Sequence, residues 1–236
     1  MAKKINIKGP IVGNSEAWIY EWFGIEATSS KSVNDSLSQA DGEDIEVEIN
    51  SGGGSVFAGS EIYTALKSYP GNVTVKIVGL AASAASVIAM AGKKVLMSPT
   101  AQMMIHNVSS CAAGDYREME HAAEILKSAN DTIANAYRLK TGKTQEELLK
   151  LMDNETWMTA QKAKELGFID EIMFENDSQL VASTDYSGML PQEVINKIRN
   201  TIKSPNVGEN NNSDFLIQQS KAQLNLLKLK GEMNNG

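Results

Sequence analysis

The chain has 236 residues, of which 42% are hydrophobic and 22% charged, and a formal net charge of −7. This composition excludes disorder throughout, and the negative charge without a Lys/Arg stripe argues against a nucleic-acid surface. The single cysteine, Cys111, excludes an internal disulfide, and the apolar residues 78–91 fall short of the roughly 20 that span a bilayer, so we expect a cytoplasmic protein without membrane association.

The first half of the chain alternates predicted strands with predicted helices. Apolar patterns of period two predict strands at residues 5–11, 45–49 and 73–78. Helical stretches lie between them, at residues 15–26, 32–40 and 58–69. This order predicts an α/β fold in which helices cover the faces of a mostly parallel sheet. Trp18 and Trp22 share a helix face that we expect in the core or at a subunit contact.

The second half is more helical. Its predicted elements are short strands at 94–97 and 102–105, a long helix at 115–141 that ends at Gly142, and helices at 144–152 and 159–166. From Asn176 onward serine, asparagine and glycine become frequent, which is typical of a linker. We therefore predict a compact domain at residues 1–174 and a low-complexity, weakly amphipathic tail at residues 175–236.

The two histidines of the chain differ in their setting. His121 lies between Glu120 and Glu124 on the long helix, which predicts an exposed imidazole. His106 follows the strand 102–105, at the sheet edge where parallel α/β folds form their sites. His106 is therefore the candidate general base, against the alternative of a buried structural histidine.

Ser83 stands where a strand is predicted to end and a helix of small residues to begin, in the run Gly79-Leu-Ala-Ala-Ser83-Ala-Ala. The free N–H groups and the dipole at a helix N-terminus can stabilise an oxyanion and assist a nucleophile. Serine is also a common helix cap. Taken alone, Ser83 therefore has two interpretations, nucleophile or cap.

A glycine-rich loop, Asn50-Ser-Gly-Gly-Gly-Ser-Val56, follows the strand 45–49. Glycines let a backbone approach a substrate closely and present its N–H donors. A phosphate loop or a simple turn would have the same composition. The chain has no Walker A motif, because Tyr137 stands where its first glycine should be, and no G-x-S-x-G elbow. We expect no cofactor and no metal.

The order of these features closely resembles the Clp protease proteolytic subunit family. The similarity runs from about residue 4 to residue 174 and includes Ile49-Asn-Ser-Gly-Gly-Gly-Ser-Val56, Gly79-Leu-Ala-Ala-Ser83, Met104-Ile-His106 and Ala160…Ala163…Gly167-Phe-Ile-Asp170. It implies the fold that this family shares with crotonases, namely stacked ββα units, a mostly parallel sheet with flanking helices and a protruding handle helix, here 115–141. It also implies a serine endopeptidase.

Carried over position by position, the resemblance implies that Ser83 is the nucleophile and His106 the base. Gly54 and Ala84 match the family's oxyanion donors, and Gly53 lies beside them in the substrate-binding loop. These roles follow the logic of a hydroxyl–imidazole–carboxylate triad.

The acid of the triad is less clearly marked. The family usually has aspartate at the position where spacing from His106 places Glu155, 49 residues on. Asp153 is the alternative, since residues two apart in an extended segment point the same way. A dyad that uses neither carboxylate is the third interpretation.

The resemblance implies polypeptide substrates and a homo-oligomeric ring or double ring that stacks through the handle helix. Gly52 stands where the family usually has proline, and Asn107-Val108 where Gln-Pro is common. The short segment before the first strand leaves little room for the axial loops that dock a ring ATPase, which argues against an ATPase partner.

The short N-terminus, the Asn-rich tail and the run Glu155-Thr-Trp157-Met-Thr159 resemble most the Clp-related proteases of phages and prophages. This implies processing of capsid or scaffold proteins, in the host cytoplasm or in the phage prohead. The alternatives are a crotonase-type acyl-CoA enzyme and a ring-forming scaffold whose chemistry has decayed.

Overall fold

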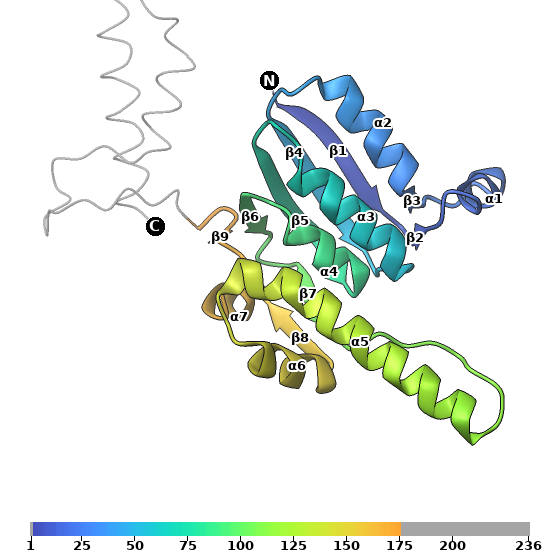
Figure 1. The fold of residues 1–236 in the computed structure, drawn as a ribbon. Helices are drawn as coiled ribbons and strands as arrows, with labels where there is room; N and C mark the ends of the chain where they lie inside the picture. Colours follow the sequence, from blue (N-terminus) through green and yellow to red (C-terminus); the bar gives the residue numbers. More distant parts are fainter. Residues whose placement is uncertain (1, 176–236) are drawn as a thin grey trace, which may run out of the picture. The chain divides into compact units, whose positions relative to one another are not determined.

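A mostly parallel sheet organises residues 2–175, the part of the chain that this computed structural model describes (Figure 1). The expected α/β architecture is confirmed. The large sheet contains seven strands: β1 (Lys3–Lys8), β4 (Ile45–Ser51), β5 (Val73–Ala82), β6 (Lys94–Met97), β7 (Gln102–Ile105), β8 (Thr156–Thr159) and β9 (Glu171–Ile172). A second sheet pairs β2 (Ile11–Val12) with β3 (Thr28–Ser29).

The central strand β5 fixes the topology, because it is long enough to pair with two strands along one edge. The order is β1-β4-β5-β6-β9, all parallel, and β7 pairs with the far end of β5, where Ala82 lies opposite Met104. β8 then adds antiparallel to β7. Val73, Val75 and Ile77 alternate into the core, as their spacing predicts.

Seven helices belong to the described residues: α1 (Ala17–Trp22), α2 (Ser30–Ala40), α3 (Val56–Lys67), α4 (Ala84–Ala89), α5 (Tyr116–Thr141), α6 (Gln145–Asp153) and α7 (Ala160–Glu165). α3 packs between α2 and α4, and α4 also contacts α5 (Figure 1). Small residues allow this close packing: a Cβ on Gly59 of α3 would lie 3.0 Å from the Cβ of Ala84. Every residue of α4 is buried.

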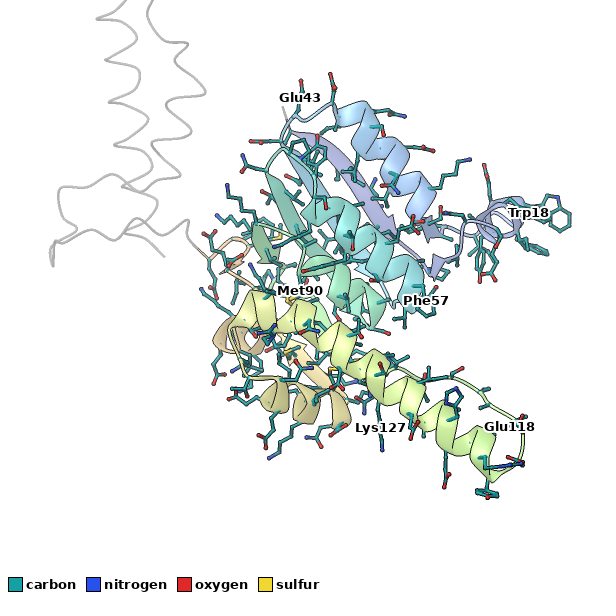
Figure 2. The ribbon with its side chains drawn as sticks, in the orientation of Figure 1. Trp18, Glu43, Phe57, Met90, Glu118 and Lys127 are labelled. Carbon is teal, nitrogen blue, oxygen red and sulfur yellow. The ribbon has the colours of Figure 1, made fainter. Side chains whose placement is uncertain are left out.

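The N-terminal segment differs from the sequence expectation in two ways. The predicted strand 5–11 is split after Lys8, because Gly9 has a φ of 64° and Pro10 has no N–H for a ladder. The predicted helix 15–26 is reduced to the six residues of α1, with Trp18 64% and Trp22 75% exposed. Figure 2 shows Trp18 pointing away from the sheet. A place in the core is therefore wrong for both tryptophans.

Helix α5 has the bounds that its sequence predicts. Asp115 caps the N-terminus of the helix. Gly142, with a φ of 71°, ends the helix at its C-terminus, as expected of a glycine stop. Its N-terminal half projects from the rest of the described chain (Figures 1 and 2). The residues that α5 buries, Ala134, Ala136 and Tyr137, lie in its C-terminal half.

The predicted tail from residue 175 lies outside the described residues, apart from Glu175. Within residues 2–175, no helix combines the length and the apolar character needed to cross a bilayer.

Candidate active site

Ser83 lies at the junction of β5 and α4, in a backbone conformation that residues with a side chain rarely adopt. Its φ is 55° and its ψ −127°. The hydroxyl makes no cap bond to α4. Instead, the Ser83 Oγ lies 2.8 Å from the Nε2 of His106. The interpretation of Ser83 as a mere helix cap is therefore wrong.

His106 directly follows β7, and the parallel pairing of β5 with β7 brings it to Ser83. The Ser83 N–H donates to the Met104 carbonyl at 3.0 Å, which extends the ladder one residue beyond Ala82. Ser83 and His106 thus lie just beyond the carboxyl ends of β5 and β7, where parallel α/β folds form sites. The imidazole is half-buried. For its Nε2 to accept the Ser83 proton, its Nδ1 must carry the ring hydrogen.

Gly54 and Ala84 both line the space beside Ser83. Ile11 donates to the Gly53 carbonyl at 2.9 Å and accepts from the Ser55 N–H at 2.8 Å. In a parallel ladder this pattern leaves the N–H of the intervening residue, Gly54, directed away from Ile11. The Ala84 N–H is free of intrahelical bonds because Ala84 is the first residue of α4. These are the two donors that the sequence suggests for an oxyanion.

The glycine loop is held against Ser83 so closely that Gly53 has no room for a side chain. Gly53 has a φ of 94°, and a Cβ there would lie 2.7 Å from both the Ser83 Cβ and the Ala82 carbonyl oxygen. Ser51 fixes the loop, since its Oγ donates to the Gly9 carbonyl at 2.6 Å and accepts from the Gly53 N–H at 3.1 Å. Gly52, by contrast, has open space around it.

Both candidate acids precede β8, the strand that pairs with β7. Asp153 is the last residue of α6, so the expectation that it shares an extended segment with Glu155 is wrong. Glu155 lies in a turn with a φ of 45°, directly before Thr156, which pairs with Ile105 of β7. The Glu155 carboxylate accepts from the Trp157 indole at 3.1 Å. The Asp153 carboxylate accepts from the Asn107 amide at 2.8 Å. Within the described residues, no hydrogen bond joins either carboxylate to His106.

Comparison with known proteins agrees with this geometry. The family model for the Clp protease matches residues 25–176, more than half of the chain. A stretch of 164 residues is 34% identical to the ATP-dependent Clp protease proteolytic subunit 1 of Chlamydia abortus, and covers 64% of this chain and 85% of that protein.

The chain belongs to the Clp protease family. The corresponding protein of Chlamydia caviae is 34% identical over 167 residues, 66% of this chain and 87% of that protein. The proteolytic subunit of Bacteroides fragilis is 35% identical over 136 residues, 57% of this chain and 66% of that protein. The chain is accordingly a serine peptidase, and the α/β fold described above is the one that the family resemblance implies.

A pocket opens beside Ser83 in this Clp protease. Ser83, His106, Gly54 and Ala84 line it together with side chains from three helices and the loop after His106, namely Val56, Val87, Asn107, Val108, Ser109, Ile133 and Tyr137. Sequence reasoning assigned no pocket role to the apolar members of this set. They come from α3, α4, α5 and the loop after His106, so no single motif in the chain groups them.

The remaining polar candidates lie away from this pocket. His121 is exposed on α5, as its flanking glutamates predict. The described residues include no cluster of three or more His, Cys, Asp or Glu side chains arranged to hold a metal ion. The side chains that a hydrogen bond joins at the pocket beside Ser83 are those of Ser83 and His106.

Proposed function

We propose that this chain hydrolyses peptide bonds through an acyl-enzyme on Ser83, with His106 as the general base. The observation that carries the proposal is the 2.8 Å distance between the Ser83 Oγ and the His106 Nε2. A serine hydroxyl is a weak nucleophile unless an adjacent base takes its proton, and a hydrogen-bonded imidazole is well suited to do so.

The proposed reaction proceeds in two balanced halves. The Ser83 Oγ attacks the scissile carbonyl carbon while His106 Nε2 takes its proton, and the Gly54 and Ala84 N–H groups donate to the resulting oxyanion. His106 then gives the proton to the leaving amine as the C–N bond breaks. Water then attacks the ester carbonyl carbon while His106 Nε2 takes its proton. As the C–O bond to Ser83 breaks, His106 returns that proton to the Ser83 Oγ, and the acid is released. Each oxyanion donor contributes about 3 kcal/mol of transition-state stabilisation.

We assign the third member of the triad to Glu155, with Asp153 as the alternative. The position of Glu155 directly before Thr156, which pairs with Ile105, supports the first assignment. The hydrogen bond between Asp153 and Asn107, the residue after the histidine, supports the second. A carboxylate at the His106 Nδ1–H would fix the tautomer that leaves Nε2 free to accept.

The pocket suggests which bonds are cleaved. Val56, Val87 and Ile133 give it an apolar wall next to Ser83. Such a wall favours an apolar side chain on the residue whose carbonyl is attacked, because burial of that side chain releases water. The substrates we propose are therefore polypeptides with apolar residues at the cleaved position.

We further propose that the chain acts as a homo-oligomeric ring or double ring. The support is the projecting half of α5, where Ile125 is 56% and Met119 37% exposed. Such apolar exposure on a helix marks a surface that a partner covers. The relatives named above are ATP-dependent by name.

The narrower proposal is that the substrates are phage capsid or scaffold proteins in a host cytoplasm or a prohead. It rests on the resemblance of the run Glu155-Thr-Trp157-Met-Thr159 and the Asn-rich segment to phage-encoded relatives. Co-expression with the matching capsid precursor tests it. The expected result is a shortened product that is lost in Ser83→Ala, and an unchanged precursor would refute this part of the proposal.

The peptidase proposal itself is tested by hydrolysis of an unfolded polypeptide and of short fluorogenic peptides with an apolar residue before the reporter. We expect cleavage by the wild type, none by Ser83→Ala or His106→Ala, and full activity in Ser110→Ala, which removes an exposed hydroxyl outside the site. Cleavage by Ser83→Ala at the wild-type rate would contradict the proposal.

The same variants, offered an acyl-CoA thioester as a second substrate, separate the two alternatives. A crotonase-type enzyme would act on an acyl-CoA thioester with Ser83 replaced, because its oxyanion donors need no nucleophilic hydroxyl. A decayed scaffold would assemble but cleave nothing. Neither alternative explains why the Ser83 hydroxyl is hydrogen-bonded to an imidazole.

A further inference from the structure

A second series of hydrogen bonds, separate from the one to His106, reaches the backbone carbonyl of Ser83. The Ser86 Oγ lies 2.6 Å from the Ser83 carbonyl oxygen and 2.8 Å from the Tyr137 hydroxyl. The carbonyl can only accept, so the single Ser86 proton is donated to it. The Tyr137 hydroxyl must then donate to Ser86. These hydrogen bonds therefore run in one direction: Tyr137 donates to Ser86, and Ser86 donates to the Ser83 carbonyl.

The Ser86 and Tyr137 hydroxyls are both buried. Ser86 is 0% and Tyr137 1% exposed. Burial raises the pKa of the Tyr137 hydroxyl, so it stays protonated and remains a donor. Its ring is fixed by an edge-on contact with Phe168, whose centroid lies 5.6 Å away. A buried hydroxyl that loses its hydrogen-bond partner raises the free energy of the folded state. The two hydrogen bonds therefore resist rearrangement.

The carbonyl at the end of this series belongs to a residue in a strained conformation. Ser83 has a φ of 55°, which is unfavourable for a residue with a Cβ and persists only where the surroundings enforce it. The Ser86 N–H and the Val87 N–H also donate to this carbonyl, at 2.9 Å and 3.3 Å. The Ser86 side chain therefore adds a third bond, the shortest of the three, at the peptide unit that follows Ser83.

We propose that Tyr137 is a positioning residue for the nucleophile, acting through Ser86 to hold the left-handed backbone of Ser83. This inference rests on the proposed role of Ser83. Tyr137 does not touch the scissile bond in this account, although it also lines the pocket. Its two roles have different kinetic signatures: loss of positioning lowers kcat, whereas loss of pocket wall raises KM.

The test replaces Tyr137 by phenylalanine, which removes the hydroxyl and keeps the ring. Tyr63→Phe is the matched control. Tyr63 is a half-buried tyrosine on helix α3, and its hydroxyl has no hydrogen-bond partner among the described residues. We expect Tyr137→Phe to lower kcat and the rate of Ser83 labelling by a small alkyl fluorophosphonate about tenfold. KM should stay within about twofold, and Tyr63→Phe should match the wild type.

Ser86→Ala and the Ser86→Ala/Tyr137→Phe double variant identify the route. If Tyr137 acts through Ser86, the double variant is no slower than Ser86→Ala. Additive losses, a loss confined to KM, or equal losses in Tyr63→Phe would overturn the inference. If the wild type is labelled at Ser83 and Tyr137→Phe is labelled equally fast, the inference fails while the proposed function stands. If the wild type is not labelled at Ser83, both fail.

Discussion

Helices α4 and α5 bury their apolar residues in opposite ways. All six residues of α4 are buried within the described chain, whereas α5, with 26 residues, buries three near its C-terminal end. The apolar spacing of α5 continues into the projecting half, yet Ile125 there is 56% exposed. A periodic apolar stripe thus does not tell whether its own chain covers that helix face.

The difference divides the molecule by function. Around α4, close backbone packing holds Ser83, the glycine loop and the end of β7 in fixed relation. The outer half of α5 contributes nothing to that site within the described residues. Substitutions near α4 should therefore change catalysis in a single chain, whereas substitutions on the outer part of α5 should change association between chains.

The largest expected effect near α4 is that of His106→Ala. Without the imidazole, no base takes the Ser83 proton, so we expect kcat/KM for a fluorogenic peptide to fall about 10³-fold. The thermal unfolding midpoint should change little, because the imidazole is half-buried and its recorded partner is the Ser83 hydroxyl. His121→Ala, at the other histidine, is the control and should retain full activity.

The next effect tests the close packing of the glycine loop. In Gly53→Ala the new Cβ would clash with the Ser83 Cβ and the Ala82 carbonyl oxygen. A residue with a side chain is also strained at a φ of 94°. We therefore expect the free energy of unfolding to fall by about 2 kcal/mol and kcat to fall markedly. Gly52→Ala adds the same atom where nothing lies within 4 Å. Urea unfolding and peptide hydrolysis compare the two, and equal behaviour would contradict the described loop.

A smaller effect separates the two acids. Glu155→Gln should lower kcat about 100-fold if Glu155 orients His106, whereas Asp153→Asn should cost less than about twofold. Steady-state kinetics on the paired variants decides between them. The reverse order would assign the acid to Asp153, and two unchanged variants would favour a serine–histidine dyad.

The smallest effect on the single chain is expected on the outer part of α5. Ile125→Ser should change the free energy of unfolding by less than about 0.5 kcal/mol, because the side chain is exposed, yet it should weaken self-association. Lys127→Ser, on the same helix, is the control. Light scattering on both variants measures the oligomer, and identical assembly would argue against α5 as the contact surface.

Much of the site could be predicted from the sequence because parallel strands bring their carboxyl ends to one edge. The glycine loop, Ser83 and His106 each follow a predicted strand, so their meeting at that edge needs only the sheet order. The run of glycines in the loop also predicts that its backbone packs closely against a neighbouring segment. That Gly53 packs on the Ser83 backbone is the physical reason for this composition.

Other features could not be predicted because they depend on tertiary geometry. Ser86 and Tyr137 are 51 residues apart, and neither belongs to a motif that marks the hydrogen bond between them. The exposure of Trp18 and Trp22 depends on what covers α1, which periodicity does not describe. The left-handed backbone of Ser83 has no sequence signal, since serine is rarely found there.

The central claim is that the Ser83 hydroxyl is activated by His106, and site mapping of a fluorophosphonate adduct tests it most directly. Peptide mass spectrometry of the labelled protein should place the phosphonyl group on Ser83 alone, with labelling slowed at least about 100-fold in His106→Ala. A modified residue other than Ser83, or labelling at the wild-type rate without the imidazole, would contradict the account.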